Sequence, residues 1–453
     1  MNLMKKIGLW VTETHFDELS ESVIQDVKRA FWDTVGVIVA GANEPVSTKV
    51  YNYVKNDRAQ GEVTVFTKGH KFYPPSASVV NATMAHALDF DDAELITKCH
   101  SSAVLVPAIM AVGEHLDSSG KDLITAYVIG LEVMTKLNTL LGTSHYESGW
   151  HSTSTLGAFG ATAAASKLYG LSASQIENAF GITASKISGL RKNFGTMTKP
   201  LHCGFAAETG ISSAILASQG FTANKNIFEG NLSFFSLYGK SNDFAKVERL
   251  SFENPSNILS CNLHIKRYPS CLGTHRAADV ILDYFLKDFY FEPSDILEIQ
   301  CIGSRGSFAA VIHDEPTTGL EGKFSIQYVI AAALKDKKID IDSFSDEMVQ
   351  RPEIQEIMSR IKKIEKPSGK IGGDDKKFTI VEIKMKSGRI IEKMNESAKG
   401  SPVNPLSDEQ LMEKYTYCTK HLFSKDQIED TSKVFNSLED LGKISDLIGL
   451  FRW

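Results

Sequence analysis

Three stretches of the chain are unusually rich in small residues, and they restrict the fold more than any other feature. SSAVLVPAIMAVGE (101–114), STLGAFGATAAASKLYG (154–170) and HCGFAAETGISSAILASQG (202–220) carry Ala, Gly and Ser at helical spacing. Small side chains allow helix axes to approach closely. We therefore expect tightly stacked, buried helices. The plainer alternative is that these small residues serve packing alone.

Helical patterns fill the first half of the chain, and the pattern changes near residue 260. ESVIQDVKRAFWDTVGVIVAG predicts a helix from Glu21 to Gly41, and a similar pattern runs from Gly120 to Gly142. ILEIQCIG (296–303) resembles a strand, and KFTIVEIKMKSGRIIEKM (377–394) predicts a hairpin that turns at Ser387-Gly388. PEIQEIMSRIKKIE (352–365) reads as a helix between these strands.

The predicted fold is therefore mainly α. A large all-helical domain, residues 1–262 and 398–453, is interrupted by a smaller α+β domain, residues 263–397. In the returning helical segment, Ser407 is the expected N-cap. A chain of 453 residues is long enough for two or three domains.

Composition excludes several classes of protein. The net charge of −6, with no run rich in Lys and Arg, argues against a nucleic-acid partner. The six cysteines show no CxxC spacing, so we expect reduced thiols and a cytoplasmic protein. We expect no signal peptide, because the N-terminal sequence has no sustained apolar core. The uncharged stretch 149–166 contains too much Ser, Thr, Gly and His for a membrane span, so no membrane partner is expected.

Four polar islands interrupt the apolar sequence. The first, HALDFDDAELITKCHSSAVLVPA (86–108), groups three aspartates ahead of His100. It can be a metal cradle, a proton-transfer site with a raised pKa, or a solvated loop that caps the next helix. The others are GWHSTSTLG with His151, NFGTMTKPLHCG (193–204) with Lys199 and His202, and IKRYPSCLGTHRAAD (265–279).

Lys199 raises a question of its own. Thr198-Lys199-Pro200 argues against a helix, because proline removes a donor and disfavours helix in the residue before it. No carboxylate lies nearby in the sequence to pair with the lysine. We expect an irregular turn that directs a lone, half-buried cation into a cleft, where the carboxylate of a substrate is its partner.

Together, and in this order, the islands HALDFDDA, GWHSTSTLG, KNFGTMTKPLHCG and KRYPSCLGTH resemble the MmgE/PrpD family, whose members include 2-methylcitrate dehydratase, cis-aconitate decarboxylase and iminodisuccinate epimerase. LEGKFSIQY and SPVNPLSDEQ extend the resemblance to nearly the whole chain. It implies a helical domain with an α+β lid domain, a homodimer, a site in the crevice between the domains, and no metal or organic cofactor.

The resemblance also implies roles for particular residues. Asp89, His100, His151 and Lys199 fall on family active-site positions, and Lys266 faces them from the lid. We expect the following set of site residues: Asp89, His100, His151, Lys199 and Cys271 as catalytic, and Lys266, His202 and His275 as substrate-binding.

The chain departs from the cis-aconitate decarboxylases at two positions. Ala93 stands where they carry Thr, and Cys271 stands where they carry His. These motifs are more similar to the iminodisuccinate epimerase. The expected function is therefore cofactor-independent proton transfer at a carbon beside a carboxylate of a small di- or tricarboxylate, most like that epimerase. The alternatives are a cis-aconitate decarboxylase or a 2-methylcitrate dehydratase-like lyase.

Cys271 distinguishes these possibilities. A thiol near cations can ionise and carry a proton on one face of the substrate carbon, opposite a histidine or lysine. It can equally be a small buried apolar residue. A metal-dependent hydrolase built on the Asp and His islands and a non-catalytic helical scaffold are the competing hypotheses from other classes.

Overall fold

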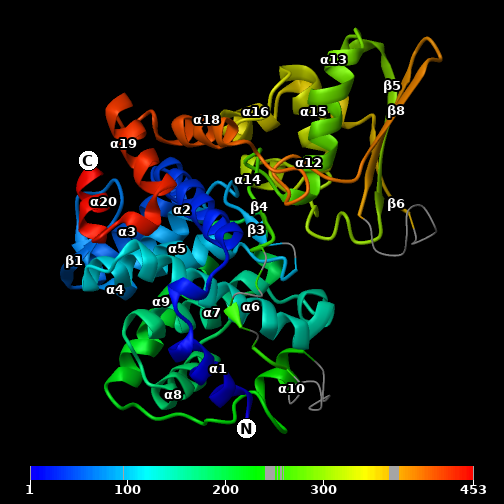
Figure 1. Cartoon of the computed structure of the whole chain (residues 1–453). Coiled ribbons are helices and arrows are strands. Elements are labelled where there is room, and N and C mark those ends of the chain that lie inside the picture. Colours follow the sequence, from blue (N-terminus) through cyan, green and yellow to red (C-terminus); the bar gives the residue numbers. More distant parts are fainter. Residues whose placement is uncertain are drawn as a thin grey trace.

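The computed structural model describes residues 2–94, 96–239, 250–252, 254–255, 258, 260–366 and 377–451. The protein is mainly α, with 58% helix and 10% strand. Its buried apolar residues form two main clusters. The larger spans residues 3–265 and 406–451, which we call the helical part, and the other lies mostly in residues 268–391, which we call the α+β part (Figure 1).

Both long helices expected in the first half are present. Helix α2 spans Glu21–Gly41, as predicted. Helix α6 spans Gly120–Glu147 and so continues past Gly142, where a φ of 62° marks a kink. By length and composition α6 could cross a membrane, and 67% of its most apolar window is buried inside the protein.

The helices rich in small residues stack closely, as expected. They are α5 (Ser101–Leu116), α7 (Ser152–Leu168) and α9 (Thr198–Ser218), and α9 packs on both α7 and α4 (Pro74–His86). A Cβ at Gly210 would lie 2.4 Å from the Cβ of Ala161. A side chain there would push α7 and α9 apart.

The C-terminal helices return to the helical part. Helix α18 (Asp408–Thr419) begins at the predicted cap, where the Ser407 side chain accepts from the Gln410 amide. It packs on α2, as does α19 (Lys425–Asn436), whereas α20 (Ile444–Leu450) packs on α5. The other main elements of this part are α1 (Leu3–Glu13), α3 (Pro45–Asp57), β1 (Gln60–Thr64), β2 (Lys71–Phe72), α8 (Ala173–Ala184) and α10 (Phe234–Tyr238).

A four-stranded sheet with order β6-β5-β7-β8 forms the frame of the α+β part. Strand β5 (Ile296–Ser304) pairs with β7 (Thr379–Met385), which pairs with β8 (Ile390–Asn395), all antiparallel. The predicted hairpin is confirmed, and its turn contains Gly388 with a φ of 86°. The helices of this part are α12 (Leu272–Asp279), α13 (Leu286–Asp288), α14 (Gly319–Gly322), α15 (Ile326–Asp336), α16 (Asp346–Val349) and α17 (Pro352–Met358).

The helix predicted over residues 352–365 is wrong in its second half. Helix α17 ends at Met358, and Ile361–Lys366 forms strand β6, parallel to β5. Ile361 and Ile364 lie opposite Ile299 and Ile302 of β5. Pairing with β5 and the β-branched side chains outweigh the helical spacing.

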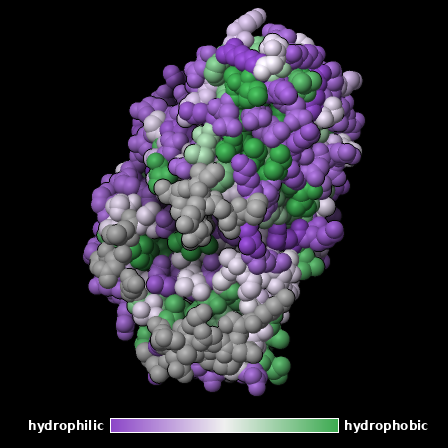
Figure 2. All heavy atoms as spheres, turned by 90° about the vertical axis from the view of Figure 1, so that its right-hand side faces the viewer, coloured by the Kyte–Doolittle hydropathy of each residue, from purple (hydrophilic) through white to green (hydrophobic). Residues whose placement is uncertain are grey.

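Seen from the side that carries this sheet, the surface is mixed. Figure 2 shows hydrophobic groups among hydrophilic ones. Tyr290, Leu297 and Ile390 are among the exposed large apolar side chains of the α+β part.

A short pair of strands connects two segments that contain polar islands. Strand β3 (Ala93–Glu94) lies in the first island, directly after its three aspartates, and pairs with β4 (Leu263–His264), just before the α+β part begins. This pairing brings the first and fourth polar islands together although they lie far apart in the sequence.

Candidate active site

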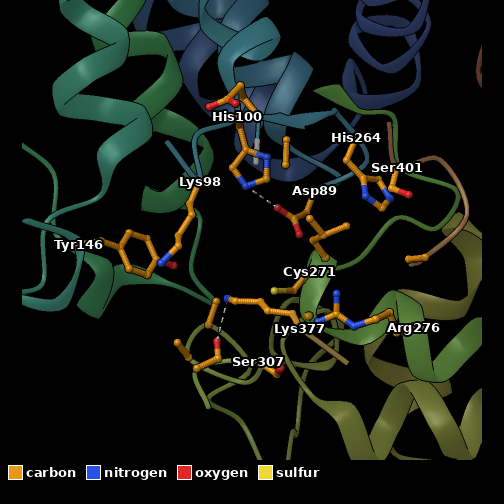
Figure 3. A pocket seen from close by; sticks show the side chains of 18 of the residues that line it. Asp89, Lys98, His100, Tyr146, His264, Cys271, Arg276, Ser307, Lys377 and Ser401 are labelled. Atoms are coloured by element: carbon orange, nitrogen blue, oxygen red, sulfur yellow. Dashed lines mark hydrogen bonds and ion pairs between the residues drawn. The ribbon is translucent and has the colours of Figure 1, made fainter. Parts of the chain in front are cut away.

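A cavity of about 770 Å³ is lined by residues from both parts of the protein. All five residues predicted to be catalytic line it: Asp89, His100, His151, Lys199 and Cys271. Figure 3 shows Asp89 and His100 on one side of Cys271, and Arg276 and Lys377 on the other. The structure therefore brings four distant islands to one cavity.

The three residues predicted to bind substrate do not line this cavity. Lys266 is buried beneath Asp89, to which it is bonded. His202 lies behind His151, with 2.9 Å between their Nδ1 atoms. His275 is buried in α12, with its ring beside Tyr268 and its Nε2 donating to the Ser270 carbonyl. Lys266 and His202 thus contact residues that line the cavity, and the His275 ring lies beside that of His264, which also lines it.

Four helices begin at the cavity wall. His100 is the N-cap of α5, His151 of α7 and Cys271 of α12, and Lys199 lies in the first turn of α9. A helix N-terminus carries partial positive charge and unpaired amide groups, so it favours an anion. Four such ends at one cavity favour a polyanionic ligand.

Buried lysines hold the turn that carries Asp89. Lys323 donates to the carbonyl of Leu88 (2.7 Å), Lys266 to that of Asp89 (2.7 Å) and Lys414 to that of Phe90 (2.8 Å). Asp89 itself has a φ of 52°, a left-handed conformation that aspartate tolerates better than most residues. The three lysines, here called the lysine clamp, fix this turn from three separate elements.

Lys199 corrects two expectations. It lies in a helix and not in an irregular turn, because Pro200 falls in the first turn of α9, where proline removes no intrahelical hydrogen bond. It also has a carboxylate partner, since its Nζ lies 2.6 Å from Asp89 Oδ1. Burial alone would raise the pKa of Asp89, but Lys199 and Lys266 outweigh burial and hold that pKa well below its usual range. Asp89 is therefore an anchoring anion and a poor base.

His86 is a site residue that sequence reasoning missed, although it begins the first island. The Lys199 ammonium is 2.6 Å from His86 Nε2, which must accept, so the ring proton lies on Nδ1 and is donated to Asp91 at 2.9 Å. Burial lowers the pKa of His86 to about 3. His86 thus stays neutral and links Lys199 to Asp91.

His100 presents a free ring nitrogen to the cavity. Its Nδ1 lies 3.1 Å from Asp91 Oδ2 and 3.0 Å from the Asp92 carbonyl, so Nδ1 carries the proton. Its Nε2 is directed toward Asp89, 3.8 Å from Oδ1. Burial lowers the pKa of His100, and also that of His151, so both rings are neutral at neutral pH. Neutral His100 is a proton acceptor at Nε2.

Cys271 does not behave as the expected thiolate. Burial, and next the charge of Asp89, raise the pKa of its thiol. The lysines near it do not reverse this effect. At neutral pH Cys271 is a protonated thiol, so it can give a proton but not take one.

A metal ion does not fit the aspartate and histidine cluster. His86, Asp89, Asp91 and His100 offer ligand atoms within 4.8 Å of one another. The Lys199 ammonium, however, contacts both His86 Nε2 and Asp89 Oδ1, the atoms a cation would need. Lys266 adds a second positive charge 3.2 Å from Asp89 Oδ2. The two lysines already supply the positive charge that a metal ion would bring to these ligand atoms.

Several other residues that line the cavity could not be recognised as site residues from the sequence. They include Lys98, Tyr146, Phe194, His264, Arg276, Phe324 and Lys377. Phe194 and Phe324 face Lys199, with ring centroids 5.3 and 5.1 Å from its Nζ. Lys323 of the lysine clamp lies in LEGKFSIQY, a motif used above only for the resemblance, and burial lowers its pKa to about 8.

Comparison with known proteins supports the resemblance. The MmgE/PrpD N-terminal domain matches residues 5–246, and the MmgE/PrpD C-terminal domain matches residues 268–440. The chain is 29% identical to a human cis-aconitate decarboxylase, over 96% of this chain and 91% of the relative. It is 28% identical to the mouse cis-aconitate decarboxylase (96% and 90%) and 25% identical to one from Aspergillus terreus (97% and 94%).

The ion pair of Lys199 predicts a loss of stability, contrary to the expectation of a free lysine. Lys199→Met should lower the free energy of unfolding by about 3 kcal/mol, the low end for breaking a buried pair, because Lys266 still faces Asp89. Urea denaturation measures this change. In Lys199→Met/Asp89→Asn much of the loss should be recovered. Simple addition of the two single effects would show that the pair is not coupled.

Asp92 predicts a pH dependence of stability. Burial raises its pKa from 3.8 to about 7, so the folded protein favours the protonated form. The stability that Asp92 contributes is full below pH 3.8 and is lost as the pH rises through about 7. Asp92→Asn should therefore gain about 2–3 kcal/mol relative to the parent between pH 5 and pH 8. A constant difference across that range would contradict this account.

Proposed function

The chain belongs to the MmgE/PrpD family, and we propose that this enzyme is a lyase that decarboxylates a small tricarboxylate, with cis-aconitate as the first candidate, without a cofactor. One observation carries the proposal: four helix N-termini and the Lys199–Asp89–His100 cluster meet in one cavity. The similarity to cis-aconitate decarboxylases over nearly their whole length directs the choice of reaction.

The reaction needs one proton at a carbon beside a carboxylate. In cis-aconitate the carboxylate on the methylene carbon leaves as CO2, and its electron pair forms a new double bond to the central carbon. The electrons of the original double bond take up a proton at the outer carbon, which bears a carboxylate of its own. The product is itaconate. The negative charge that develops on the carbon skeleton as CO2 leaves must be stabilised by fixed positive groups.

Residues of the cavity supply these needs. Two of the three Lys199 N–H groups are taken by His86 and Asp89, which leaves one for a substrate carboxylate. The helix N-termini add positive potential where the charge develops. His100 Nε2 takes a proton from solvent and gives it to carbon. Because burial lowers the pKa of His100, its protonated form is rare but a strong acid.

A second candidate rests on Cys271. An epimerase needs a base on one face of the carbon and an acid on the other. Neutral His100 and the protonated Cys271 thiol line the same cavity in these two states. This arrangement supports epimerisation of an iminodisuccinate-type substrate, the expectation drawn from the motifs.

A panel of cis-aconitate, 2-methylcitrate and iminodisuccinate in D2O separates the reactions by NMR. We expect cis-aconitate to yield CO2 and itaconate with one deuteron on its saturated carbon, the carbon that bears a carboxylate. Deuterium entering iminodisuccinate without loss of CO2 or water would select the epimerase instead. Turnover of none of these substrates would contradict both candidates.

Two variants test the roles in the same assay. His100→Gln should lower kcat by roughly 10²–10⁴-fold, because a general acid–base group is lost, whereas His421→Gln, at an exposed histidine outside the cavity lining, is the matched control. Cys271→Ser should change kcat for decarboxylation by less than about tenfold. If Cys271→Ser instead slowed deuterium entry into iminodisuccinate as strongly as His100→Gln, this would support the epimerase.

A further inference from the structure

A second group of cations lines the cavity away from the Lys199–Asp89 pair. It consists of Arg276 in α12, Lys377 just before β7, and Lys98 between β3 and α5. In Figure 3 Arg276 and Lys377 lie across Cys271 from Asp89 and His100. None of the roles assigned above uses these three residues.

Arg276 is held in place but has no carboxylate partner in the described residues. Its Nε donates to Thr379 Oγ1 at 3.3 Å, which fixes one edge of the guanidinium against β7. The two aspartates nearest to it on the same helical stretch are occupied elsewhere, because Arg267 pairs with Asp279 at 3.2 Å and also with Asp283. Within the described chain, no carboxylate lies within 4.0 Å of the Arg276 guanidinium.

The acidic residues of the cavity do not neutralise this group either. The Glu94 carboxylate accepts from the amides of Ile96 and Thr97, at 2.8 and 2.6 Å. Among the described residues Glu396, although it lines the cavity, forms no ion pair with Arg276 or Lys377. Asp89 belongs to Lys199 and Lys266.

An arginine in this state favours an anion from outside the chain. Removing a guanidinium from water without a counter-ion is unfavourable, and a bound carboxylate restores two charge-assisted hydrogen bonds. The planar fork of arginine matches both oxygens of a carboxylate, whereas lysine offers a single point charge. Burial also lowers the pKa of Arg276, as expected for an incompletely paired cation.

We propose that Arg276, together with Lys377 and Lys98 of the same cavity lining, forms a second carboxylate subsite that holds a non-reacting carboxylate of the substrate. The inference rests on the proposed function, because it assumes that the substrate is a small polycarboxylate. It adds what that function leaves open: the enzyme distinguishes a tricarboxylate from a dicarboxylate by the group that reaches Arg276.

The test is equilibrium binding of inert ligands, so it does not depend on turnover. Tricarballylate, which carries three carboxylates on a saturated chain, is titrated calorimetrically into the parent enzyme. Glutarate and methylsuccinate each lack one of its carboxylated groups. Arg276→Gln should weaken tricarballylate binding by roughly 10- to 100-fold, as expected for losing a charge-assisted pair. Arg276→Lys should recover part of this loss.

The ligand series identifies where Arg276 acts. In the parent, both dicarboxylates should bind more weakly than tricarballylate. In Arg276→Gln, at least one dicarboxylate should bind less than about threefold more weakly than tricarballylate. The carboxylate that this ligand lacks would have bound Arg276, so its absence no longer matters once Arg276 is replaced. Arg389→Gln removes the same charge from an exposed arginine that does not line the cavity. It therefore controls for the effect of the protein's net charge on anion binding.

The outcomes separate the two proposals. Unchanged tricarballylate affinity in Arg276→Gln, or an equal effect of Arg389→Gln, overturns the subsite and leaves the proposed function in place. If Arg276→Gln weakens the binding of all three ligands by the same factor, Arg276 only maintains the shape of the cavity, and the subsite is also overturned. Failure of the parent to bind tricarballylate at all overturns the polycarboxylate function itself. Thermal unfolding of each variant confirms that it is folded.

Discussion

The site depends on how three consecutive carbonyl groups are held. The lysine clamp places Lys323, Lys266 and Lys414 on the carbonyls of residues 88, 89 and 90. Lys323 comes from the α+β part, Lys266 from the segment after β4, and Lys414 from α18, which packs on the helical part. Buried ammonium groups are costly unless they are fully hydrogen-bonded, so this arrangement strongly favours one position of the turn. It fixes Asp89 and, through the ion pair, Lys199.

The electrostatics of the cavity follow from that position. Asp89 remains an anion beside two lysines, while burial keeps His86, His100 and His151 neutral. The positive ends of four helices face the same space. A cavity with fixed positive potential, one free lysine N–H and a neutral imidazole suits a substrate with several carboxylates, because it binds anions and still has a base to move a proton.

The sequence predicted the helices, the sheet hairpin and all five residues expected to be catalytic at the cavity, because local periodicity and the island motifs carry that information. It could not show that Asp89 pairs with Lys199, since 110 residues separate them. It misplaced residues 361–365 because isoleucine spacing fits a helix until β5 is available as a partner. The sequence did not single out Arg276, because its proposed role rests on the absence of a carboxylate partner among the described residues, which only the folded structure shows.

The most direct test is the kcat of Lys323→Met on whichever carboxylate the parent turns over. Lys323 is bonded to the carbonyls of Leu88 and Pro269 and does not line the cavity, so it acts by holding other residues in place and not by contact with the ligand. The account predicts a kcat lower by about 100-fold, as for a misplacement of about 1 Å, with KM little changed and the protein folded. A folded Lys323→Met enzyme with the kcat of the parent would show that the clamp does not position Asp89 and would contradict the account.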